Sequence, residues 1–272
     1  MPHTIHFTKM HGAGNDYIYV YLPDNPIPNP ARASVELSRP HFGIGSDGLI
    51  LIDRGDTEEA DFRMRVFNND GSEAKMCGNG IRCVAKYVHD HGLTDKTTLR
   101  IGTLSGVKVV ALHLTDGVAT AATVDMGEPE VKNEGLRMED KGLRTKDACI
   151  SMGNPHYVCF VDDVMSVDVA SEGARLEYGA VAGERCNVEF ATVCSDGTIR
   201  LRVWERGSGI TMACGTGACA TAVAACVLGL AGRTSQVRMD GGTLQIDWLP
   251  DNHILMTGPA ATVFEGTITM ED

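Results

Sequence analysis

The sequence predicts an α+β protein of two similar domains, each consisting mostly of strands with one central helix. Residues 64–93 and 201–230 align without a gap at an offset of 137 residues (201 − 64). Similarity at one fixed offset indicates a duplicated unit. The second observation is the pattern of many strand-like segments and few helical ones. The length of 272 residues suits two domains of ordinary size.

Strands are predicted where β-branched and apolar residues alternate or run between turn residues. In the first half these segments are 4–10, 16–22, 48–53, 61–67, 98–101, 106–113 and 117–125. In the second half a strand–turn–strand unit covers 147–162, and strands follow at 186–194, 198–204, 235–239, 242–248, 252–257 and 261–269.

Helices are predicted at 31–39, 79–91, 168–178 and 216–229. Segment 79–91 places Ile81, Val84, Ala85 and Val88 at helical spacing. Segment 216–229 is apolar nearly all round, as expected of a helix enclosed by sheet. The hinge between the halves falls near 115–122, so we expect an N-terminal domain at 1–120 and a C-terminal domain at 121–259. The last segment, 260–272, is expected to cross back and complete the N-terminal domain.

Composition narrows the class of partner. A formal charge of −12 argues against nucleic acid and anionic membrane as partners, because both require basic patches. The first residues lack a basic stretch followed by an apolar one, so no signal peptide is predicted. The uncharged segment from Gly207 to Gly232 contains a helix shorter than the roughly 20 residues of a membrane span. We therefore expect a cytoplasmic protein.

Nine cysteines are present, without any C-x-x-C pair and without zinc-finger spacing, so no metal site is predicted. A disulfide framework belongs to small secreted domains. Most of these cysteines are interpreted as small buried apolar residues: Cys83, Cys149, Cys159, Cys194, Cys219 and Cys226. Cys186 is left unassigned.

The repeat places Cys77 and Cys214 at the same point, each between a strand and a glycine-flanked helix start. A helix N-terminus offers unpaired backbone N–H groups that bind a carboxylate and lower the pKa of a thiol. Glycines there allow unusual backbone angles or the close approach of a ligand. Each corner thus offers an activated thiol and an anion site.

Two such thiols facing each other suit racemisation or epimerisation without a cofactor. A thiolate removes the proton next to a carboxylate on one face, and a thiol delivers a proton on the other. Donors placed where the carboxylate gains charge stabilise the intermediate. A single Cys-Gly-x-Gly would be interpreted as a structural turn. The duplication at identical spacing favours catalysis.

The chain resembles diaminopimelate epimerase in six motifs that span nearly its full length. They are FTKMHGAGNDY (7–17), FNNDGSEAKMCGNGIRC (67–83), SMGNPH (151–156), ERCN (184–187), VWERGSGITMACGTGACA (203–220) and GGTLQIDW (241–248). The resemblance implies two pseudo-symmetric domains, each a curled, mostly antiparallel sheet around a central helix, with the substrate in the cleft between them. It also implies conversion of LL- to meso-diaminopimelate, no cofactor, and a possible homodimer.

The resemblance further implies that Cys77 donates and Cys214 accepts a proton in the LL-to-meso direction. It implies that His156 and Glu205 adjust the pKa values of the cysteines. The implied substrate-binding residues are Asn15, Asn68, Gly78, Asn79, Asn154, Asn187, Glu205, Arg206, Gly215 and Thr216. From the residues alone, an arginine such as Arg206 is more commonly a solvated group at a strand end. Glu205 could equally be a surface carboxylate, and His156 a turn residue after Asn-Pro.

Gly48 stands where the family often has glutamine, so we leave position 48 out of the site. The loop 43–48 formally matches a dinucleotide-binding fingerprint, but the strand-like Leu49–Ile52 follows it where that motif requires a helix. Rival functions are another racemase of the superfamily, acting on proline, histidine or lanthionine, and a thiol-redox or binding protein. The aligned differences Asn68/Glu205, Asn69/Arg206 and Asn79/Thr216 should set specificity.

Overall fold

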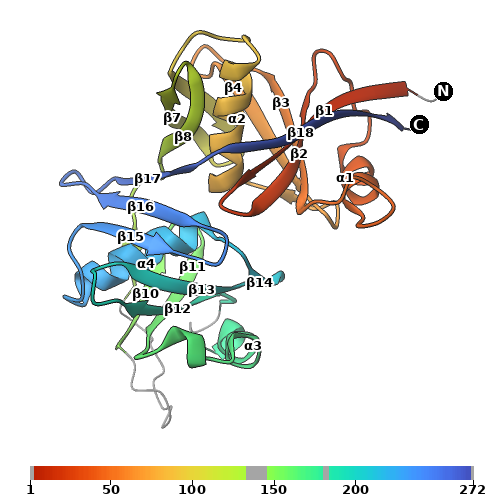
Figure 1. Ribbon diagram of the computed structural model, residues 1–272. Coiled ribbons are helices and arrows are strands. Elements are labelled where there is room, and N and C mark those ends of the chain that lie inside the picture. The colour runs from red at the N-terminus through yellow and green to blue at the C-terminus, as the bar shows by residue number, and fades with distance from the viewer. Residues whose placement is uncertain (1–2, 133–145, 180–183, 271–272) are drawn as a thin grey trace. The chain divides into compact units, whose positions relative to one another are not determined.

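The computed structural model describes residues 3–132, 146–179 and 184–270. The chain divides into two compact units, which are described separately below. The first unit contains Met1–Val124 and Gly258–Asp272, and the second contains Asp125–Thr257. Both consist mainly of strands with few helices (Figure 1), so the predicted α+β class is confirmed.

The sheet of the first unit has the order β18–β1–β2–β3–β4–β6–β7–β8. The β2/β3 and β4/β6 pairs are parallel and the others are antiparallel, and the short β5 pairs with β4. The C-terminal strand β18 runs beside β1 (Figure 1). The elements are β1 (His3–Gly12), β2 (Asn15–Tyr21), α1 (Pro30–Ser38), β3 (Gly48–Arg54), β4 (Phe62–Asn68), β5 (Glu73–Ala74), α2 (Gly78–Asp90), β6 (Thr98–Thr103), β7 (Gly106–Thr115), β8 (Val118–Asp125) and β18 (Ala261–Met270).

The sheet of the second unit repeats this arrangement in the order β9–β10–β11–β12–β13–β15–β16–β17. Its parallel pairs, β11/β12 and β13/β15, occupy the corresponding places. The duplication therefore extends well beyond the 30-residue segment that sequence similarity identifies. The elements are β9 (Glu130–Val131), β10 (Lys146–Ser151), β11 (Pro155–Phe160), a 3₁₀ turn (Val164–Ser166), α3 (Val169–Gly179), β12 (Asn187–Val193), β13 (Ile199–Glu205), β14 (Gly209–Thr211), α4 (Gly215–Val227), β15 (Thr234–Arg238), β16 (Thr243–Trp248) and β17 (Ile254–Pro259).

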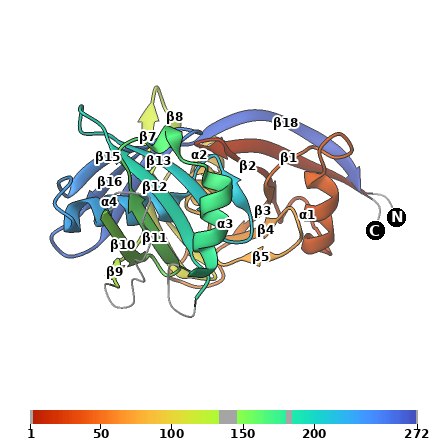
Figure 2. The same ribbon diagram turned by 90° about the horizontal axis from the view of Figure 1, so that it is seen from below.

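Helix α3 runs across β12 and β13 (Figure 2), two strands that also contact α4. Helix α2 packs against β1, β2, β4, β6 and β7, and α4 packs against β10–β13, β15 and β16. The four apolar residues predicted to form one face of α2 are all fully buried. In α4 nearly every residue is buried, and small alanines allow the strands to approach closely. No helix in the described part of the chain is long and apolar enough to cross a membrane.

The crowding around α4 gives a test of the packing. Ala224 is fully buried, so Ala224→Leu forces a larger side chain into a filled space. We expect a loss of about 1–3 kcal/mol in the free energy of unfolding, measured by urea denaturation followed by circular dichroism. The matched control is Ala174→Leu on the exposed side of α3, which should change stability little. Equal losses in both variants would contradict the enclosed position of α4.

Candidate active site

The two repeated cysteines cap the enclosed helices at their N-termini. Cys77 precedes α2 and Cys214 precedes α4, both with extended backbone (φ −134°, ψ 113° and φ −124°, ψ 114°). Each sulfur accepts a hydrogen bond from the backbone N–H three residues later, over 3.3 Å from Gly80 and 3.4 Å from Gly217. The predicted start of each helix directly after its cysteine is confirmed. This is the capping geometry more often made by serine or aspartate.

The glycines of these corners serve close packing. Neither Gly80 nor Gly217 has a positive φ, so unusual backbone angles are not the reason for glycine here. A Cβ on Gly80 would lie 2.5 Å from Cδ1 of Ile50, and one on Gly217 would lie 2.8 Å from Oε1 of Glu189. In each unit a strand side chain therefore passes directly beneath the first helical turn.

In the first unit, polar amides surround the thiol of Cys77. The thiol donates to Oδ1 of Asn15 over 3.4 Å, and Nδ2 of Asn79 lies 3.4 Å from the same oxygen. Asn79 is almost completely buried, and Arg82 holds its Oδ1 over 2.9 Å. Asn15, from the motif at 7–17, therefore forms one cluster with Cys77 and Asn79, from the motif at 67–83.

In the second unit, carboxylates lie near the thiol of Cys214. Its sulfur is 3.5 Å from Oγ1 of Thr216, and Glu205 hydrogen-bonds to the thiol. The hydroxyl of Thr211 donates to Oε1 of Glu205 over 2.6 Å. Glu205 is therefore part of the thiol's surroundings, and the alternative reading of Glu205 as a surface carboxylate is wrong.

His156 contacts Glu189, a residue near Cys214 that the sequence did not indicate. His156 lies on strand β11, fully buried, so its predicted place on a turn is wrong. Its Nδ1 is 2.7 Å from Oε1 of Glu189, which is also fully buried. Nε2 of His156 and Oε2 of Glu189 find no hydrogen-bond partner in the described part of the chain.

These neighbours change the expected acidity of Cys214. Burial raises its pKa well above the usual range, and the carboxylates of Glu205 and Glu189 raise it further. The hydroxyl of Thr216 and the N–H of Gly217 lower the pKa, but they do not outweigh the other effects. The helix start therefore lowers the pKa of Cys214 as expected, but burial and the two carboxylates raise it by more. Burial likewise raises the pKa values of both glutamates.

The remaining predicted binding residues lie near the ends of strands. Asn68 ends β4 and donates to Oγ of Ser72 over 3.0 Å. Asn187 is buried at the start of β12, and its Oδ1 accepts from the backbone N–H of Arg206 over 2.8 Å. Arg206 is exposed just after β13, and Asn154 is half-buried just before β11. Gly78 and Gly215 begin the two helices.

Gly48 begins strand β3, so the strand predicted after the glycine loop is confirmed and a dinucleotide-binding helix is excluded at this point. A Cβ at position 48 would lie 2.1 Å from the carbonyl oxygen of Phe67 and 2.9 Å from the ring of Tyr17. A glutamine does not fit this backbone. The glycine at a position where the family often has glutamine therefore belongs to the local packing of β2, β3 and β4.

The other cysteines are mostly buried and inert. Burial raises the pKa values of Cys83 and Cys149 to about 11 and that of Cys186 to about 12. Four of the six cysteines predicted to be buried are buried, whereas Cys194 and Cys226 are partly exposed. No group of three or more potential metal ligands occurs among the described residues.

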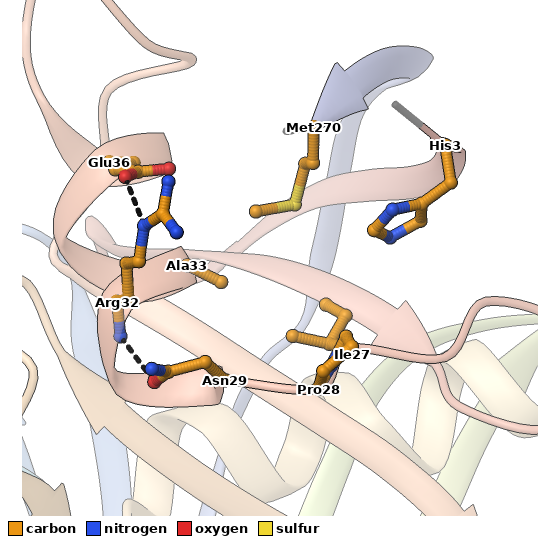
Figure 3. A pocket seen from close by; sticks show the side chains of 8 residues that line it. All are labelled: His3, Ile27, Pro28, Asn29, Arg32, Ala33, Glu36 and Met270. Carbon is orange, nitrogen blue, oxygen red and sulfur yellow. Dashed lines mark hydrogen bonds and ion pairs between the residues drawn. The ribbon is translucent and has the colours of Figure 1, made fainter. Parts of the chain in front are cut away.

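A pocket of about 270 Å³ lies at a different place in the first unit (Figure 3). Apolar side chains form much of its wall, and an ion pair between Arg32 and Glu36 stands on helix α1 at one side. None of its lining residues is a predicted site residue: His3, Ile27, Pro28, Asn29, Arg32, Ala33, Glu36 and Met270.

Comparison with known proteins bears on both the motifs and the fold. The sequence profile of the family "Diaminopimelate epimerase" matches residues 7–132 and 148–263. The chain belongs to this family. The predicted resemblance is thereby confirmed.

Two relatives named diaminopimelate epimerase match almost end to end. The protein from Bacteroides thetaiotaomicron is 55% identical, over 98% of this chain and 98% of its own. The protein from Phocaeicola vulgatus is 52% identical, over 99% of this chain and 100% of its own. Identity at this level extends over both units.

Solved structures with similar folds are much more distant in sequence. A PhzF-family phenazine biosynthesis protein from Bacillus anthracis aligns with a TM-score of 0.75 at 16% identity, covering 98% of this chain and 99% of that one. A hydroxyproline epimerase from Agrobacterium vitis aligns with a TM-score of 0.71 at 15% identity, covering 99% and 93%. These likenesses support the fold alone.

The surroundings of Cys214 predict a measurable change on removal of one carboxylate. Glu205→Gln removes a negative charge beside the thiol, so the pKa of Cys214 should fall by roughly one unit. Thiolate absorbance near 240 nm, taken as the difference from the same protein carrying Cys214→Ala, measures this change. Glu172→Gln on α3 is the control, because Glu172 pairs with Arg175. A Cys214 titration unaffected by Glu205→Gln would contradict the contact.

Proposed function

We propose that this chain is a cofactor-independent epimerase that converts LL-diaminopimelate to meso-diaminopimelate with two thiols. Two observations support the proposal together. One is membership of the diaminopimelate epimerase family. The other is the matched position of Cys77 and Cys214 as N-caps of equivalent helices. Each unit supplies one of the two thiols.

In the proposed reaction, a thiolate removes the proton from the α-carbon of the substrate, and the C–H electron pair moves toward the α-carboxylate. The charge that develops there is stabilised by backbone N–H groups at the helix starts, beginning with Gly78–Asn79 and Gly215–Thr216. The opposite thiol then delivers its proton to the other face of the carbon. The product has the inverted centre, and the two sulfurs have exchanged protonation states.

In the LL-to-meso direction Cys214 is assigned as the base and Cys77 as the acid. A base must be ionised, and Cys214 lies among groups that accept protons. Glu205 is hydrogen-bonded to the thiol, so it is placed to take the proton as the thiolate forms. The nearby carboxylate of Glu189 opposes this ionisation. An ammonium group of the substrate adds positive charge and thereby favours the thiolate.

The distal amino acid end of the substrate requires partners for an ammonium and a carboxylate. We assign Asn15, Asn68, Asn154, Asn187 and Arg206 to substrate binding, several of them at this end. Arg206 is exposed just after β13, and its planar guanidinium suits a carboxylate. A domain boundary near residue 120, a cytoplasmic location and a homodimer stay predictions.

Isotope exchange tests the reaction directly. LL-diaminopimelate incubated with the purified protein in heavy water, without pyridoxal phosphate, should form the meso isomer with deuterium at one α-carbon. Proline, histidine and lanthionine tested alongside separate this reaction from those of other racemases. Mass spectrometry and chiral chromatography detect both events. Neither exchange nor inversion with diaminopimelate would refute the proposed function.

Replacement of either thiol tests the two-base mechanism. Cys77→Ala and Cys214→Ala should each lower kcat for epimerisation by at least about a hundredfold, because each removes one proton carrier. Cys226→Ala is the control, since Cys226 lies near the end of α4, remote from its N-cap. Near-normal turnover by either single variant would show that one of the two thiols is dispensable.

A further inference from the structure

The first unit contains a chain of side chains that fixes the orientation of the amide of Asn15 beside Cys77. Arg82 donates from Nη2 to Oδ1 of Asn79 over 2.9 Å. Nδ2 of Asn79 donates to Oδ1 of Asn15 over 3.4 Å. Nδ2 of Asn15 donates to Oδ2 of Asp47 over 2.7 Å. All three hydrogen bonds run in one direction, from the guanidinium to the carboxylate.

The two charged ends determine this direction. A guanidinium only donates hydrogen bonds, so Arg82 can face only the oxygen of the Asn79 amide. Oδ2 of Asp47 also accepts from the backbone N–H of Asp16 over 3.1 Å, which marks it as an acceptor. The nitrogen of Asn15 must therefore point to Asp47, and its oxygen is left to face Cys77 and Asn79. A reversed amide would place oxygen against oxygen at Asp47.

Both ends of the chain are held firmly. Arg82 is fully buried and also donates to the carbonyls of Gly78 and Pro259. Asp47 is exposed, but its backbone N–H donates to Asp16 over 2.9 Å and its carbonyl accepts from Asn69 over 3.0 Å. These backbone contacts join the loop before β3 to the starts of β2 and of the β4–β5 turn.

The second unit lacks both charged ends. Residue 82 aligns with Cys219 at the offset of 137. Gly48 of β3 pairs with Tyr17 of β2 and Asn68 of β4. In the second unit Asn187 of β12 occupies the place of Gly48, because it pairs with His156 of β11. Asp47, the residue before Gly48, therefore corresponds to Cys186, the residue before Asn187, which is buried and uncharged. The charged ends belong to the Cys77 corner alone among these matched positions.

We propose that Asp47 is a positioning residue that keeps Cys77 protonated by holding the oxygen of the Asn15 amide toward the thiol. The thiol proton then has an acceptor 3.4 Å away. A freely turning amide could instead present its N–H₂ group to the sulfur, which stabilises a thiolate. The consequence for catalysis rests on the proposed function: a protonated Cys77 can act as the acid in the LL-to-meso direction.

Alkylation of Cys77 tests the proposal, because a thiolate reacts with iodoacetamide and a thiol does not. Cys77 is partly exposed, and mass spectrometry of its peptide measures the rate. The titratable neighbours Tyr19 and Cys83 are buried, with raised pKa values, and stay neutral near pH 7. Asp47→Ala removes the acceptor that orients Asn15 and should speed alkylation at pH 7 about threefold to tenfold, the range expected for one hydrogen bond.

The control is Asp16→Asn, which removes one negative charge from the same corner without touching the side chain of Asn15. Asp16 forms an ion pair with Lys9, and asparagine keeps an acceptor for that lysine. Asp47→Asn is a second control, because its amide oxygen can still accept from Nδ2 of Asn15, and it should speed alkylation less than Asp47→Ala. Asp47→Leu repeats the test if the Asp47→Ala variant does not fold, as judged by circular dichroism. Equal acceleration by Asp16→Asn and Asp47→Ala would overturn the proposal, because only loss of charge would then be at work.

A double-variant comparison separates amide orientation from every other effect. In an Asn15→Ala background, Asp47→Ala should change the alkylation rate no further, since no amide remains to be oriented. A persistent effect of Asp47→Ala there would refute the positioning role. In the otherwise unchanged chain, Asp47→Ala should also lower kcat for LL-diaminopimelate. A chain that never epimerises diaminopimelate would refute the proposed function, while the alkylation rates would still decide this inference.

Discussion

Each unit depends on one close contact, in which a strand side chain passes beneath the first turn of the enclosed helix. Ile50 fills this place in the first unit and Glu189 in the second, against Gly80 and Gly217. The contact fixes the helix start against the sheet. The thiol three residues before each glycine is then held as the helix cap. Position and orientation of the sulfur thus follow from packing that any substitution with a Cβ would disturb.

The two cysteines have the same backbone geometry but different electrostatic surroundings. The first places an isoleucine below the helix start and neutral amides around Cys77. The second places a buried glutamate and histidine below it, and a further carboxylate against Cys214. A carboxylate in a poorly solvated place opposes ionisation of a nearby thiol. An amide favours the thiol when its oxygen faces the sulfur and the thiolate when its N–H₂ group does. Backbone symmetry therefore does not impose equal acidity on the two cysteines.

Sequence patterns predicted nearly all of the longer elements, because apolar periodicity and glycine-marked turns are local signals. They missed strands β5, β9 and β14, which have two, two and three residues. Such short pairings depend on neighbouring strands rather than on their own sequence. His156 was placed on a turn because Asn-Pro precedes it, but pairing with β10 and β12 extends β11 to include it.

The candidate site also contains residues that the sequence predicted and residues that it did not. The repeat identified Cys77 and Cys214, since duplicated residues are visible without a structure. Glu189, Asp47 and Arg82 were missed because their importance lies in contacts between segments far apart in the chain. One signal was available for Glu189: it is the single charged residue within the strand 187–193. A charge inside an otherwise apolar strand requires a buried partner, and His156 supplies it.

A two-base reaction requires that one proton be shared unequally between two chemically identical groups. Identical corners would hold that proton equally, and neither thiol would be committed as acid or base. The corners of this chain differ at residues that touch the sulfur or orient its neighbours: Asn15, supported by Asp47, on one side, and Glu205 and Glu189 on the other. In the proposed reaction, the thiols and helix starts, which the duplication keeps alike, provide the chemistry. The residues around them, which the duplication allowed to diverge, are proposed to decide where the proton resides.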